Sequence, residues 1–77
     1  MREKRGIRGT REYTEYYVNR RRMVIVQRLR PSLPWVIYDS VLGKTTHTVD
    51  HDMDRRRAEE KALAYIKGLK RAGVRGV

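Results

Sequence analysis

Two runs of β-forming residues, separated by a short proline-containing turn, constrain the fold of this chain more than any other feature. Residues 23–30, MVIVQRLR, are rich in β-branched and long apolar side chains, and they end at Pro31, which favours an extended conformation for the residue before it. Residues 35–40, WVIYDS, supply a second such run after the turn. We therefore predict two neighbouring antiparallel strands.

The segment that follows predicts a third strand. Residues 45–49, TTHTV, are threonine-rich and β-branched, and a Gly43-Lys44 turn stands before them. They can pair with residues 35–40 as a hairpin across residues 40–44. Along the middle strand, Trp35 and Ile37 point to one face and Val36 and Tyr38 to the other. We expect Trp35 in the core and the opposite aromatic side chain, Tyr38, near the surface.

From Asp54 the apolar period changes to that of a helix. A helix of about 18 residues is expected, with one apolar face that needs a sheet to cover it. Asp52 or Asp54 can cap its start, and Gly73 is placed to end it. Lys70 and Arg71 suit the negative end of the helix dipole. The apolar face comprises Ala58, Ala62, Tyr65, Ile66 and Leu69.

The chain before residue 23 is harder to interpret. Residues 1–12 are mostly charged and hold a single aliphatic residue after Met1, so we predict a flexible basic arm. In residues 13–22 an amphipathic patch of tyrosines fits either a short helix or an irregular strand. The predicted fold class is therefore α+β: a three-stranded antiparallel sheet packed against one C-terminal helix, within a single small domain at residues 13–77.

Positive charge is the strongest functional signal. The 77 residues carry a formal net charge of +10, and the basic side chains are mostly arginine, whose planar fork pairs with phosphate or with a guanine edge. Residues 1–30 hold ten basic and three acidic side chains and residues 55–77 hold eight and two, whereas residues 31–54 hold one and four. Binding to a polyanion is favoured over the alternative, a solvated charged face.

Candidate binding residues follow from this distribution. The arginines before and along the first predicted strand and those that open the helix are expected to converge on one row of phosphates, and Tyr38 could stack on a base. The predicted nucleic-acid-binding residues are Arg5, Arg8, Arg11, Arg20, Arg21, Arg22, Arg28, Arg30, Tyr38, Lys44, Arg55 and Arg56.

Catalytic and metal chemistry find little support. Asp50, Asp52 and Asp54 have calcium-loop spacing, but arginine stands where the loop needs glycine, and a lysine where it needs glutamate. His47 and His51 have no cysteine or third histidine to complete a zinc site. The phosphate-loop pattern is absent too. We predict no enzyme activity, no metal and no cofactor.

Apolar stretches are far shorter than a membrane span, and no apolar signal-peptide core follows the basic start. The chain has no cysteine, which suits a reducing compartment. We therefore expect a cytoplasmic protein without a membrane partner.

Residues 35–66 resemble the small DNA-binding domain at the N-terminus of lambda-type phage integrases, which is similar in fold to plant AP2 domains. The resemblance rests on the strand WVIYD, the Gly43-Lys44 turn, a third strand, and a helix that opens with Asp54-Arg55-Arg56 and continues through alanines. It implies a three-stranded sheet in the DNA major groove, with residues 1–11 as a tail in the minor groove. It implies no recombinase activity.

This hairpin offers Asp39 and Asp50 where such domains carry basic or polar reading residues. Arg28 and Arg30, on the strand before it, are therefore expected to supply more of the base contacts. The helix start also resembles the basic and alanine-rich box of double-stranded RNA-binding domains, with Glu59 in place of a lysine.

Three functional hypotheses remain open at this point. The first is a DNA-binding protein of phage or mobile-element origin, in which arginines neutralise phosphates. The second is an interaction module that docks on an acidic protein surface, for example a phage inhibitor of a host protein. The third is RNA binding through the same basic surface.

Overall fold

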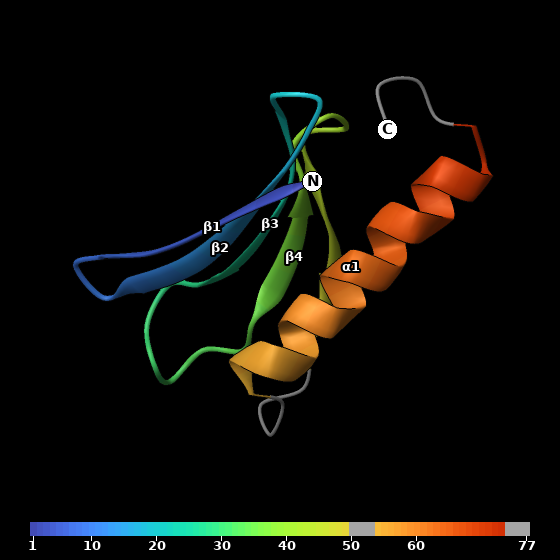
Figure 1. Ribbon diagram of the computed structural model, residues 1–77. Coiled ribbons are helices and arrows are strands. Elements are labelled where there is room, and N and C mark those ends of the chain that lie inside the picture. The colour runs from blue at the N-terminus through green and yellow to red at the C-terminus, as the bar shows by residue number, and fades with distance from the viewer. Residues whose placement is uncertain (50–53, 74–77) are drawn as a thin grey trace.

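The computed structural model describes residues 1–49 and 54–73, which form an antiparallel sheet of five strands with one helix across one face (Figure 1). The strands are neighbours in the order in which they occur along the chain. The elements are β1 (Arg2–Arg8), β2 (Arg11–Val18), β3 (Arg21–Arg28), β4 (Val36–Asp39), β5 (Lys44–Thr48) and α1 (Arg55–Arg71).

The tight turns between strands use residues that suit them. Gly9, between β1 and β2, has a φ of 63°, a conformation that glycine adopts without strain. Between β4 and β5, the Asp39 carboxylate accepts hydrogen bonds from the backbone N–H groups of Val41 and Leu42, at 2.8 and 2.9 Å. Such side-chain acceptors replace a turn's missing backbone partners. The chain therefore runs as an up-and-down meander.

The core lies between α1 and one face of the sheet. Trp35, 2% exposed, lies in it as predicted. Small residues on α1 let the helix approach the strands closely, while the β-branched and aromatic residues of β2 to β4 fill the opposite side. The core cluster consists of Tyr16, Val18, Met23, Val24, Val26, Trp35, Ile37, Val49, Ala58, Ala62 and Ile66.

The helix begins and ends close to its predicted limits. The Asp54 carboxylate accepts a hydrogen bond from the Arg57 backbone N–H at 2.9 Å, which satisfies one of the unpaired donors of the first turn. Lys70 and Arg71 lie in the last turn, and Gly73 follows with a φ of 71°. No helix in the described part of the chain has both the length and the apolar character of a membrane span.

The α+β class, the antiparallel sheet and the C-terminal helix are confirmed, but the count of three strands is wrong. The segment expected to be a flexible arm instead contributes β1 and the start of β2, with seven residue pairs joining the two strands. Side-chain composition was a poor guide here, because a strand is held by backbone hydrogen bonds and β1 buries little apolar surface.

The open choice over residues 13–22 is also resolved. These residues form most of β2, a two-residue turn at Asn19 and Arg20, and the start of β3. Consequently β3 is residues 21–28 rather than 23–30, while β4 and β5 lie within one residue of the predicted hairpin.

A buried carboxylate links β1 and β2 to the helix. Glu59 of α1 is 6% exposed and accepts two hydrogen bonds from the Arg5 guanidinium, at 2.8 and 3.0 Å. It also accepts the hydroxyl hydrogen of Thr14, at 2.9 Å. Arg55 donates to the Thr14 oxygen and to the Tyr13 carbonyl. All three elements thus meet in one polar network that compensates the burial of the charge.

We expect Glu59→Ala to lower the free energy of unfolding by about 1–3 kcal/mol, because the fully buried Thr14 hydroxyl loses its acceptor and β1 loses its link to the helix. Urea denaturation followed by circular dichroism measures this change. The control is the adjacent substitution Glu60→Ala, which removes an exposed pair with Arg56 and should cost less than about 0.5 kcal/mol. Equal losses in the two variants would contradict the account.

Candidate nucleic-acid interface

The face of the sheet opposite α1 carries no covering element among the described residues. Because Thr14 and Tyr16 of β2 point toward α1, the residues that alternate with them project from the other side. The strand pairing extends the same alternation to β1 and β4, and also to β3, where a register shift that skips Met23 places Arg22 opposite Tyr17 on this side. We call this the open face, and its main polar and aromatic side chains are Arg2, Lys4, Arg8, Arg11, Tyr13, Glu15, Tyr17, Arg22, Gln27 and Tyr38.

Arginines and tyrosines interleave on the open face. The Arg11 guanidinium carbon lies 4.5 Å from the centre of the Tyr13 ring, and that of Arg2 lies 5.7 Å from the centre of the Tyr17 ring. Arg11 also donates to the Gln27 side-chain oxygen at 2.9 Å. Stacking of this kind holds a guanidinium plane in place while leaving donors available. The guanidinium groups of Arg2 and Arg11 on the open face are therefore held partly in place by the tyrosine rings.

Ile25 and Glu15 lie opposite each other on neighbouring strands of the open face. Ile25 is 5% exposed, yet it lies outside the core cluster, because it faces away from α1. Its partners across the strands are Glu15 and Tyr38. Glu15 accepts a hydrogen bond from Arg22 at 3.0 Å. Within the described strands, Glu15 is the one acidic residue on the open face, and Arg22 balances it.

Acidic side chains elsewhere are turned to internal partners. On the helix side of the sheet, Glu12 accepts from Arg28 at 2.6 Å. Asp39 accepts from the Tyr65 hydroxyl as well as from its own turn. Counted over the described residues, every acidic side chain has an intramolecular partner: Glu3, Glu12, Glu15, Asp39, Asp54, Glu59 and Glu60. The basic side chains outside these pairs therefore dominate the external field.

Protonation on the helix side is fixed by burial and by these pairs. Burial and the hydrogen bond to Asp39 raise the pKa of Tyr65 to about 12. Burial likewise raises the pKa of Tyr16, which lies near Glu59 and Glu3. The hydrogen bond to Glu59 raises the pKa of the Arg5 guanidinium above its usual range. The two phenols therefore act as neutral hydrogen-bond donors near neutral pH.

Five of the predicted binding residues lie on the open face or at its end: Arg8, Arg11, Arg20, Arg22 and Tyr38. Four others are exposed elsewhere. Arg21 opens β3 opposite Val18, and Arg30 lies in the loop after β3. Lys44 begins β5, and Arg56 lies in the first turn of α1.

Three predicted residues are engaged on the helix side instead. Arg5 binds Glu59, and Arg28 binds Glu12 while its guanidinium carbon lies 4.8 Å from the Trp35 ring. Arg55 donates to the Tyr13 carbonyl at 2.6 Å and lies over the same tryptophan ring at 5.7 Å. Arg28 and Arg55 thus pack against the core residue Trp35, whereas the side chain of Arg5 is largely exposed and pairs with Glu59 at the edge of the core.

The expected convergence on one row of phosphates is wrong. Arg22 lies on the open face, whereas Arg55 opens the helix and lies over Trp35 on the other side of the sheet. Arg28 also faces α1, so it cannot supply the base contacts assigned to it. Asp39, expected to interfere on the hairpin, is buried on the helix side and does not reach the open face. Asp50 lies outside the described residues.

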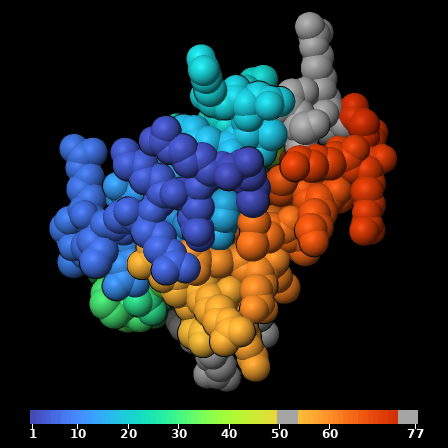
Figure 2. Space-filling view, viewed as in Figure 1, coloured from blue at the N-terminus to red at the C-terminus, as the bar shows by residue number. Residues whose placement is uncertain are grey.

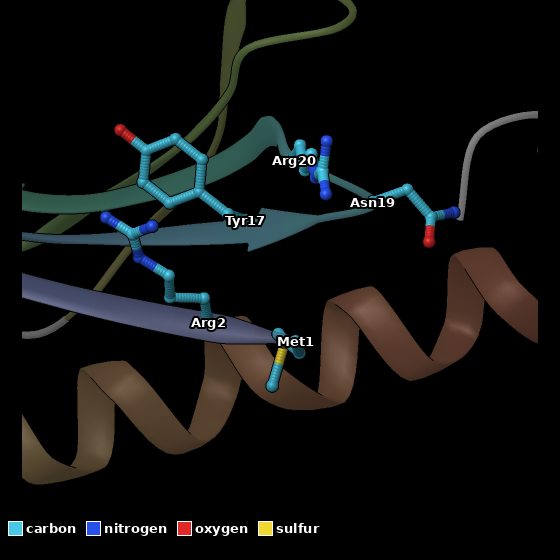
Figure 3. Close-up of a pocket in the computed structure, with 5 residues that line it drawn as sticks. All are labelled: Met1, Arg2, Tyr17, Asn19 and Arg20. Carbon is cyan, nitrogen blue, oxygen red and sulfur yellow. The ribbon is translucent and has the colours of Figure 1, made fainter.

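A hollow marks one end of the open face (Figure 3). It is lined by Met1, Arg2, Tyr17, Asn19 and Arg20, from the start of β1, the end of β2 and the turn that follows. Figure 3 shows the Arg2 guanidinium beside the Tyr17 ring. Two arginines, an amide and an aromatic ring offer the donors and the stacking surface that a phosphate or a base uses.

Both residues of the turn at this hollow are non-glycine residues in the left-handed region. Asn19 and Arg20 have φ values of 51° and 64°. Two-residue hairpin turns of this kind prefer Asn-Gly, and a residue with a Cβ in this conformation costs about 1–2 kcal/mol. Strained residues of this kind concentrate at functional sites. Arg20 is therefore a candidate for a residue kept for its side chain rather than for the turn.

We expect Arg20→Gly to raise the free energy of unfolding by about 1 kcal/mol, because glycine adopts the positive φ without strain. The matched control is Arg21→Gly, at the next position in β3, where no positive φ exists and glycine should lower stability by about 0.5–1 kcal/mol. Urea denaturation of both variants gives the comparison. An Arg20→Gly variant less stable than the wild-type protein would show that the positive φ of Arg20 carries no strain.

Sequence reasoning did not single out four basic and aromatic residues of this surface: Arg2, Lys4, Tyr13 and Tyr17. The signal was present in residues 11–18, REYTEYYV, which are rich in aromatic and β-branched residues and place Thr14, Tyr16 and Val18 at every second position. Once that segment is a strand, Arg2 and Lys4 follow from its pairing with β1.

Metal binding finds no support in the described residues, where no three His, Asp or Glu side chains gather closely enough to hold an ion. The residues tested for calcium or zinc, Asp50, His51 and Asp52, lie outside the described part of the chain.

Comparisons of the chain with family models, with characterised proteins and with solved structures give no match. The geometry of the open face therefore carries the functional interpretation.

Proposed function

We propose that this protein binds double-stranded DNA through the open face of its sheet. The observation that supports this most directly is the separation of charge: each acidic side chain of the described residues has a partner within the chain, while Arg2, Lys4, Arg8 and Arg11 project together from β1 and β2. A field of this sign attracts phosphates and speeds their encounter with the protein.

The shape of the open face suits a duplex groove. The major groove of B-DNA, about 12 Å wide, admits a two-stranded β-ribbon, and β1 and β2 form such a ribbon at the sheet edge. In Figure 1 this hairpin extends away from α1. Arg8 and Arg11, paired across its tip, are positioned for base edges or flanking phosphates. The tyrosines add sequence-tolerant contacts.

The hollow at the opposite end extends the same surface. Arg2 and Arg20 there would clamp a backbone phosphate, with the Tyr17 ring against the sugar or an unstacked base. The strain at Arg20 then has a functional reason. Arg20→Gly should give a protein that is more stable and binds DNA more weakly.

Compartment and origin belong to this proposal as well. DNA binding and the absence of cysteine both suit the cytoplasm. We extend the proposal to a phage or mobile-element origin, which follows from the sequence resemblance to integrase DNA-binding domains alone.

Fluorescence anisotropy with a labelled duplex, across a salt series, tests the proposal. We expect about micromolar binding near 100 mM salt, and a log-log salt slope of about −4, because four to five phosphate contacts release counterions. Duplex DNA should bind more tightly than single-stranded DNA or duplex RNA, whose deep, narrow major groove excludes a sheet. Preference for RNA would move the function to the RNA alternative.

A variant pair locates the binding surface. Combining Arg2→Gln, Lys4→Gln and Arg11→Gln should weaken duplex binding at least about tenfold, because three contacts are lost from one face. The control combines Arg30→Gln with Lys44→Gln, two exposed cations off the open face, and should change affinity by less than about threefold. Equal effects of the two variants would show diffuse attraction rather than a surface.

One observation favours the second candidate, a protein partner. A mainly apolar hollow borders the open face where β3, its loop and β4 meet, lined by Gln27, Leu29, Leu33, Pro34, Val36 and Thr45. Leu29 and Leu33 are 54% and 38% exposed. An acidic protein that inserts an apolar side chain there would be held by burial, so its affinity would fall little with salt, unlike that of DNA.

A further inference from the structure

A second basic surface lies on the opposite side of the molecule from the open face. The buried residues Ala58, Ala62 and Ile66 turn one side of α1 toward the sheet, so the intervening residues face outward. The exposed charged side chains of α1 comprise one acidic residue, Glu60, and six basic ones: Arg56, Arg57, Lys61, Lys67, Lys70 and Arg71. We call this group of residues the helix face.

The helix face is wide and unobstructed among the described residues. Figure 2 shows the side chains of α1, in orange to red, along the surface beside the blue side chains of β1. In Figure 1 the last turns of α1 extend beyond the strands. Glu60 lies near Arg56, so the acidic charge on this face is already paired, at 3.5 Å. Like the open face, the helix face presents unneutralised cations.

The two faces are too far apart, and too nearly opposite, for one duplex to contact both. The sheet and helix layers lie between them, and the two shorter dimensions of the molecule are 22 and 20 Å. A duplex touching both would have to turn back around a body about as thick as itself. Duplex DNA has a persistence length of about 150 base pairs, so such a bend is prohibitively costly.

We infer that this protein bridges two separate duplex segments, one on the open face and one on the helix face. The inference rests on the proposed DNA binding and adds a second, weaker site for the same ligand on the helix face. Each site is a row of cations for phosphates, and a bound duplex on one face partly neutralises the protein and leaves the other face accessible. The consequence is condensation or pairing of DNA rather than occupancy of a single site.

Capture of one duplex by another tests the inference. One short duplex is fixed to beads, a second carries a fluorophore, and the full-length protein is titrated into the mixture near 100 mM salt. We expect fluorescence on the beads to rise and then fall as protein is added, because excess protein covers each duplex separately. Binding of the single labelled duplex, measured by anisotropy, should rise without falling.

Helix-face variants separate this site from the open face. Combining Arg57→Gln, Lys61→Gln, Lys67→Gln and Arg71→Gln should reduce capture at least about tenfold while weakening single-duplex binding by less than about threefold. These side chains are exposed, and circular dichroism checks that the fold is kept. Glu60→Gln should increase capture, because it removes the acidic charge of the helix face.

The outcomes distinguish the two proposals. Single-duplex binding without capture by the wild-type protein overturns bridging and leaves DNA binding intact. Undiminished capture by the helix-face variant also overturns bridging by this surface and points to self-association, which sedimentation equilibrium of the free protein would detect. Absence of duplex binding overturns both.

Discussion

The buried carboxylate of Glu59 is the interaction on which the rest of this structure depends. It lies between α1 and the sheet, where Arg5 of β1 and Thr14 of β2 both donate to it. A charge in such a position is tolerated only when its hydrogen-bonding capacity is filled. Its two donors come from the edge strand β1 and from its neighbour β2, and β1 contributes no side chain to the core cluster. Satisfying Glu59 thus fixes β1 and β2 in place.

The position of β1 determines which of its side chains face outward. Arg5 faces inward to Glu59, so the pleat turns Arg2, Lys4 and Arg8 outward to the other side of the strand. The ion pair between Arg5 and Glu59 therefore also fixes the backbone positions from which these three cations project onto the open face. The same logic applies across the sheet, where Glu12 holds Arg28 against Trp35 and leaves Arg11, on the next pleat, beside Tyr13. The alternation of side chains along each strand thus places the paired arginines on the helix side and the outward-facing cations on the open face.

The sequence predicted those parts of the fold that depend on local pattern. The β-branched runs, the Asp54 cap and the 3.6-residue period located β3 to β5 and α1 closely, and alternation placed Trp35 in the core and Tyr38 opposite it. β1 escaped prediction because its order comes from pairing with β2 and from Arg5 meeting a residue 54 positions away. No local sequence pattern reveals the contact between Arg5 and Glu59, so the charged composition suggested a flexible arm.

The sequence indicated only part of the candidate site, because the rest depends on contacts between residues far apart in the chain. A count of arginines cannot tell those that bind carboxylates from those that face solvent, and Arg5, Arg28 and Arg55 belong to the first group. Arg8, Arg11 and Tyr38 were predicted as binding residues from charge and aromatic character, and only the strand register brings them onto one face with Tyr13 and Tyr17. The net charge suggested a polyanionic partner, and the pleat determines which charges share one face of the sheet.

The division between paired and outward-facing arginines is the central claim, and the side-chain Nε–H signals of arginine in a nuclear magnetic resonance titration test it most directly. On addition of a short DNA duplex, the signals of Arg2, Arg8 and Arg11 should shift, because these side chains exchange water for phosphate. The signals of Arg5 and Arg28, already bound to Glu59 and Glu12, should stay in place. Shifts at Arg5 and Arg28 without shifts at the other three would contradict the account.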